Sequence, residues 1–73
     1  MLPEATPYNA GPIRSRTGHL VGVQISRNGE LVAYALADEG PGFIVYSAQD
    51  GQPLRYLRRL RQLRQFYTIE QLP

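Results

Sequence analysis

The stretch Leu20 to Ala37, LVGVQISRNGELVAYALA, decides the fold. Two runs rich in Val, Ile, Leu and Tyr flank Asn28-Gly29, a dipeptide typical of a two-residue β-hairpin turn. A type I′ turn needs a positive φ at both central residues, which Asn tolerates and Gly adopts without steric cost. We therefore predict two antiparallel strands joined at Asn28 and Gly29.

The register of this hairpin follows by counting outwards from Arg27 opposite Glu30. Large apolar side chains then share one face of the hairpin, which we expect to be buried. That face holds Val21, Val23, Ile25, Val32, Tyr34 and Leu36. The opposite face carries mostly small residues, among them Gly22, Ala33, Ala35 and Ala37. Small side chains permit a close approach either by a partner or by the chain's own helix, and both interpretations stay open.

The rest of the chain divides into an arm and a domain. Residues 1–12 hold three of the six prolines, so we expect an extended N-terminal arm. Residues 13–73 form a single small domain. After a loop at 38–42, Phe43 to Ala48 reads as a third strand, and the short connections predict an antiparallel meander.

The residue composition changes at Pro53, and the segment PLRYLRRLRQLRQFY predicts a helix over 53–67. Leu, Arg and Gln are strong helix formers, and Pro suits the first helical position. One face of this helix is apolar and consists of Tyr56, Leu57, Leu60, Leu63 and Tyr67. The other face carries Arg55, Arg58, Arg59 and Arg61, with Arg64 at its border. The predicted fold is therefore α+β: a three-stranded antiparallel β-meander followed by a C-terminal basic amphipathic helix.

The segment from His19 to Leu57 resembles one blade of a β-propeller of the WD-repeat kind. Gly18-His19 stands where such repeats begin, and the strand-turn-strand of residues 21–33 is similar to the centre of a blade. The Trp-Asp pair is absent and there is no second copy, whereas a propeller closes only with several blades. No functional residue is carried over from this resemblance.

The amino-acid composition limits the classes of function that this protein can have. The chain has 73 residues, no cysteine and one histidine, His19, which excludes disulfides and argues against a metal site. The sequence points to no catalytic set and to no cofactor, so we do not expect an enzyme. It shows no secretory signal and no apolar run long enough to span a membrane, and we expect a cytoplasmic protein.

All eight basic residues are arginine, and five of them lie between Arg55 and Arg64. Clustered guanidinium groups attract acidic protein surfaces and phosphates. We expect a small interaction module, an accessory or regulatory subunit that docks on a larger protein or complex with an acidic surface, or that forms a homo-oligomer. The partner-binding residues would be Arg55, Arg58, Arg59, Arg61 and Arg64. Nucleic-acid binding by the same helix is the alternative, and a merely solvated arginine face is a third interpretation.

Overall fold

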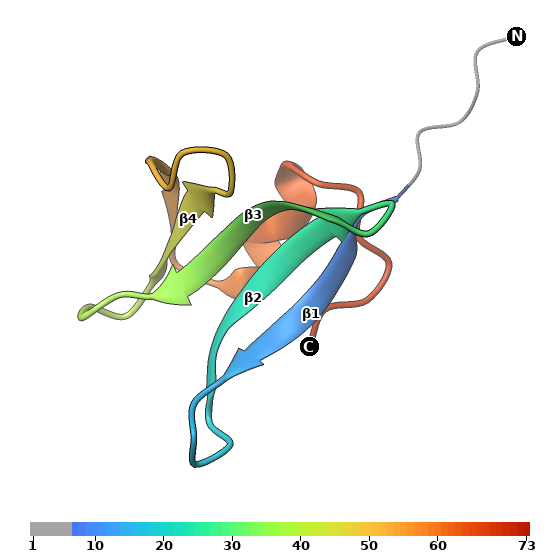
Figure 1. The fold of residues 1–73 in the computed structure, drawn as a ribbon. Coiled ribbons are helices and arrows are strands. Elements are labelled where there is room, and N and C mark those ends of the chain that lie inside the picture. The colour runs from blue at the N-terminus through green and yellow to red at the C-terminus, as the bar shows by residue number, and fades with distance from the viewer. Residues whose placement is uncertain (1–6) are drawn as a thin grey trace, which may run out of the picture.

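The computed structural model describes residues 7–73, which form one antiparallel sheet with a short 3₁₀ helix on one side (Figure 1). The five strands follow one another in the sheet in chain order, so the predicted β-meander is confirmed, with two more strands than expected. Its elements are β1 (Asn9–Arg14), β2 (Leu20–Arg27), β3 (Glu30–Ala37), β4 (Phe43–Ser47), β5 (Pro53–Leu57) and the 3₁₀ helix η1 (Leu60–Gln65).

The hairpin between β2 and β3 turns where the sequence predicts. Asn28 and Gly29 both have positive φ, 54° and 78°, as a type I′ turn requires. Arg27 faces Glu30 across the turn. The local turn chemistry therefore fixes the tip of the hairpin.

The predicted register fails beyond the tip, because β3 contains a β-bulge. Ser26 pairs with Leu31 but Ile25 pairs with Ala33, which leaves Val32 as an extra residue. One extra residue turns every later side chain of β3 to the opposite face. As a result Ala33 is buried, with Ala35 beside it, whereas Tyr34 and Leu36 lie on the other side of the sheet.

The core lies between the inner face of the sheet and the C-terminal part of the chain, and Figure 1 shows η1 behind β2 and β3. Small alanines on β3 let this segment approach the sheet closely. Of the predicted small-residue face, Ala33 and Ala35 therefore receive the chain's own C-terminal segment, whereas Gly22 lies on the other side of the sheet. The buried residues are Val23, Ile25, Ala33, Ala35, Val45, Leu57, Leu63 and Ile69.

The predicted amphipathic helix over 53–67 is wrong, and with it the α+β class, because the chain is nearly all-β. Pro53–Leu57 pairs with β4 as an edge strand, where Pro53 is tolerated since it opens the strand. Only Leu60–Gln65 is helical, and it is a 3₁₀ helix. Strand pairing overrides the helix propensity of Leu, Arg and Gln.

The apolar residues of that segment still find the core. Leu57 at the end of β5 and Leu63 in η1 are buried, and Leu60 packs against the core. Within η1, Leu60 and Leu63 are spaced by three, which matches the period of a 3₁₀ helix. Tyr56, which belonged to the predicted apolar stripe, is instead 50% exposed.

The strand β1 overlaps the predicted N-terminal arm, because residues 9–12 belong to it. The first six residues of that arm lie outside the described residues. Just before β1, the backbone N–H of Tyr8 donates to the carbonyl of Thr68 at 2.8 Å, and Tyr8 forms a parallel bridge with Ile69. The two ends of the described chain are thereby tied together. No helical segment within 7–73 combines the length and the apolar character needed to cross a membrane.

Candidate functional site

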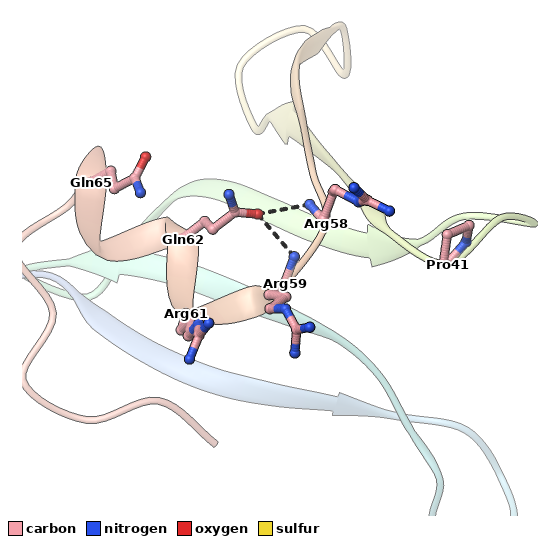
Figure 2. Close-up of a pocket in the computed structure, with 6 residues that line it drawn as sticks. All are labelled: Pro41, Arg58, Arg59, Arg61, Gln62 and Gln65. Atoms are coloured by element: carbon pink, nitrogen blue, oxygen red, sulfur yellow. Dashed lines mark hydrogen bonds between the residues drawn. The ribbon is translucent and has the colours of Figure 1, made fainter.

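Three arginines surround one open hollow of about 620 Å³, at the end of β5 and the start of η1. Figure 2 shows the Arg58 side chain extending from the chain after β5 towards Pro41. All six residues around the hollow are hydrogen-bond donors or apolar, and none is acidic. They are Pro41, Arg58, Arg59, Arg61, Gln62 and Gln65.

The side chain of Gln62 holds the backbone on one side of this hollow. Its Oε1 accepts the backbone N–H of Arg58 at 2.8 Å and that of Arg59 at 2.9 Å (Figure 2). Gln62 is the third residue of η1, and a Gln at this position commonly reaches back to unpaired N–H groups at a helix start. Because Oε1 is occupied, the Gln62 side chain offers the hollow its amide donor group.

The five predicted partner-binding arginines fall into two groups. Arg58, Arg59 and Arg61 line the hollow. Arg55 instead lies on the inner side, where its guanidinium stacks on the Phe66 ring at 3.8 Å and its Nε is buried without a hydrogen-bond partner. Arg64 donates from Nε to the Ile69 carbonyl at 3.2 Å and also to the Glu70 carbonyl, so it anchors the C-terminal segment.

Two further arginines, Arg27 and Arg14, also make contacts within the chain. The Arg27 guanidinium stacks on Tyr8 at 3.8 Å, and Tyr8 in turn packs edge-on against Tyr67. Arg14 donates to the Gly18 carbonyl in the β1–β2 turn. The arginines around the hollow therefore differ from these in facing an open space rather than a ring or a carbonyl of the chain.

The electrostatic potential of the hollow is positive, but two carboxylates lie in the loop that contains Pro41. Three arginines line the hollow, and their planar guanidinium donor forks match carboxylates and phosphates. Asp38 and Glu39 lie exposed in the same loop as Pro41, although neither lines the hollow. Their charges reduce the positive potential nearby, within the screening distance of about 8–10 Å in physiological salt.

Other candidate groups do not gather into a site. Within residues 7–73, no three His, Asp or Glu side chains lie close enough to hold a metal ion. His19 lies in the β1–β2 turn, where its N–H donates to Ser15 Oγ and its carbonyl accepts the Ser15 N–H.

A second hollow of about 630 Å³ lies beside the β2–β3 turn and the β4–β5 loop, and it was not foreseen from the sequence. Its apolar wall includes Leu31, Val32, Leu54 and Tyr67. Val32 and Leu54 are both extra residues at β-bulges, so strand irregularity turns them into this hollow. Bulges carry no local sequence signal comparable to Asn-Gly, which explains why the hollow was missed.

The lining of the basic hollow was only partly foreseen, since its three arginines were predicted but Pro41, Gln62 and Gln65 were not. Gln62 stands three residues after Arg59, the extended residue that precedes η1. This spacing is the one sequence signal that points to Gln62. Comparisons of this chain with protein-family models, with curated proteins and with solved structures found no match.

Proposed function

We propose that this chain is a small non-enzymatic interaction module, an accessory or regulatory subunit that docks on a larger protein through an acidic segment of that partner. The observation that carries the proposal is the hollow formed by Arg58, Arg59 and Arg61, which contains no carboxylate. Guanidinium forks bind carboxylates in pairs of parallel hydrogen bonds, and a partner with two or three Asp or Glu side chains matches three such forks. An arginine-lined hollow of this size accommodates several side chains of a partner.

Nucleic-acid binding is the alternative, and the tyrosines weigh against it. Tyr34 and Tyr46 stack on each other with ring centroids 5.3 Å apart, so each turns one ring face towards the other. A base-stacking platform instead presents free ring faces beside a positively charged groove. The arginines of the hollow are confined to the end of β5 and the start of η1, which suits a short acidic segment better than a strand of phosphates.

A binding titration tests the proposal with a matched pair of variants. Fluorescently labelled hexaglutamate serves as the probe, and Arg58→Gln/Arg61→Gln is compared with Arg14→Gln/Arg16→Gln. Both double variants lose the same charge, but only the first removes donors from the hollow. We expect the first variant to weaken binding by about ten-fold or more, chiefly through a slower association, and the second to leave it within about two-fold.

Two results would overturn the proposal. Equal losses in both double variants would mean that hexaglutamate senses net charge and not the hollow. Tighter binding of a mixed-sequence oligonucleotide, with a log–log salt slope near −0.7 to −0.9 per phosphate contacted and its loss in the hollow variant, would establish the nucleic-acid alternative.

A further inference from the structure

The register of the sheet places one residue from each strand in a single row across its outer face, opposite the core. Pairing passes from strand to strand without interruption along this row, which consists of Ile13, Gly22, Leu36, Ile44 and Tyr56. The neighbouring row consists of Gly11, Gln24, Tyr34, Tyr46 and Pro53. Neither row contains a charged residue.

The large side chains of these rows pack against one another and not against the core. Tyr34 and Tyr46 stack as a cross-strand pair, and Leu36 pairs with Ile44. None of them belongs to the core cluster or to the side chains packed on it. Figure 1 shows no other strand or helix of the described chain in front of β2 and β3. The β4–β5 loop reaches one end of this face, where a Cβ at Gly51 would lie 3.8 Å from the Tyr34 hydroxyl oxygen. Tyr56 is 50% exposed at the end of its row, whereas Leu36 and Ile44 are half-buried beside it. Contiguous apolar surface of this kind is a common feature of interaction sites.

Tyr56 connects the outer row to the basic hollow. Its hydroxyl and ring lie directly over Gly42, where a Cβ would collide with them. Gly42 follows Pro41, which lines the hollow, and Arg58 lies two positions after Tyr56. Tyr56 does not itself line the hollow, but it packs on the residue that follows Pro41, so the apolar row ends next to one wall of the hollow.

We propose that the outer row and the hollow form one docking surface for an amphipathic segment of a partner protein. Apolar side chains of that segment cover Leu36, Ile44 and Tyr56, while its Asp or Glu side chains enter the hollow. The inference rests on the proposed function and adds an apolar stripe to the acidic partner. The arginines of the hollow favour Asp or Glu at one end of the partner segment, because their charges are complementary. The uncharged rows favour apolar side chains in the rest of that segment.

The test is a selection of peptides from a random linear library displayed on phage, with the purified full chain as bait. Selected peptides are synthesised and titrated against the parent protein, Tyr56→Thr, Leu54→Thr and Arg58→Gln/Arg61→Gln. Leu54 is the matched control, because it is 48% exposed on the same strand but lines the second hollow. Circular dichroism melting shows that each variant is folded, and Leu36→Thr provides a second outer-face variant if Tyr56→Thr is not.

We expect enriched peptides that combine Asp or Glu with Leu, Ile, Phe or Trp. Their affinity should fall by about ten-fold, equivalent to about 1.4 kcal/mol, in Tyr56→Thr and in the arginine variant, and should hold in Leu54→Thr. Acidic peptides without apolar residues, insensitive to Tyr56→Thr, would overturn this inference and leave the proposed function standing. Failure to enrich any peptide that depends on the arginines would overturn both. Binding that is restricted to phosphatidylserine vesicles or to an oligonucleotide would overturn the protein partner itself.

Discussion

The two faces of the sheet are built from the same strands but are completed differently. The inner face, with Ala33 and Ala35, is closed by the chain's own segment carrying Leu63 and Ile69. The outer face of β3 carries larger residues, including Tyr34 and Leu36, and no strand or helix of residues 7–73 lies over it. On β3 the large side chains lie on the outer face and the small ones on the covered inner face, whereas β2 and β4 supply Val23, Ile25 and Val45 to that inner face. The inner face holds the domain together, and the outer face is the one that we propose for docking.

The largest expected effect tests which leucine holds the fold. Leu63→Ala removes a fully buried side chain from the core and should lower the free energy of unfolding by about 2–5 kcal/mol. Leu36→Ala on the outer face should cost about 1 kcal/mol, because its side chain is only partly buried. Urea unfolding of both variants measures the difference. Equal losses would erase the distinction between the faces.

The alanines of the inner face give a second test, in the direction of larger side chains. Ala35→Leu should destabilise by about 1–3 kcal/mol, because Ala35 is fully buried within the core cluster. Ala37→Leu, an exposed position on the same strand, is the control and should change stability by less than about 0.5 kcal/mol. A neutral Ala35→Leu in thermal melts would show that the C-terminal segment does not pack closely on β3.

The sequence predicts those parts of the fold that local chemistry decides. Asn28 and Gly29 fix the turn because positive φ is a property of single residues. The bulge at Val32 is decided by packing, since burying Ala33 beneath the C-terminal segment requires the extra residue. No pattern within residues 20–37 reports on that segment, and the predicted register therefore failed.

The same division applies to the candidate site. The arginines of residues 55–64 stand out by composition, and the sequence alone therefore predicts them as partner-binding residues. The sequence did not show which of these arginines remain free to bind a ligand. Arg55, for example, stacks on Phe66 only because of the path that the chain takes after β5. Helix propensity predicted one uniform arginine face, whereas strand pairing of Pro53–Leu57 separates Arg55, opposite the buried Val45, from the arginines that line the hollow.

A comparison of Arg55 with Arg61 tests whether the stacked arginine stabilises the fold while the arginine of the hollow does not, and the expected effect on stability is smaller than those above. Arg55→Gln should lower stability by about 0.5–1 kcal/mol, because the stacking on Phe66 is lost. Arg61→Gln should leave stability unchanged, since its side chain lines an open hollow. Chemical unfolding at moderate salt checks both. A larger loss for Arg61→Gln would mean that the hollow is part of the folded core's support and not a docking surface.

The smallest expected effect concerns the two carboxylates in the β3–β4 loop. Asp38→Asn/Glu39→Gln should strengthen hexaglutamate binding by about two- to five-fold at low salt, because like charges beside the hollow are removed. The gain should shrink as salt is added. The matched control is Glu30→Gln/Asp50→Asn, which removes the same two charges from exposed residues that do not line the hollow. A gain of equal size there would show that only net charge matters.

The central claim is that Arg58, Arg59 and Arg61 receive the acidic ligand, and the side-chain Nε–Hε signals of the arginines test it most directly. Two-dimensional NMR spectra of ¹⁵N-labelled protein are recorded as hexaglutamate is added, with signals assigned by single Arg→Gln variants. We predict saturable shifts for these three arginines, while the stacked Arg27 and Arg55 stay unchanged. Shifts of equal size at Arg14 and Arg16, or none at the hollow, would contradict the claim.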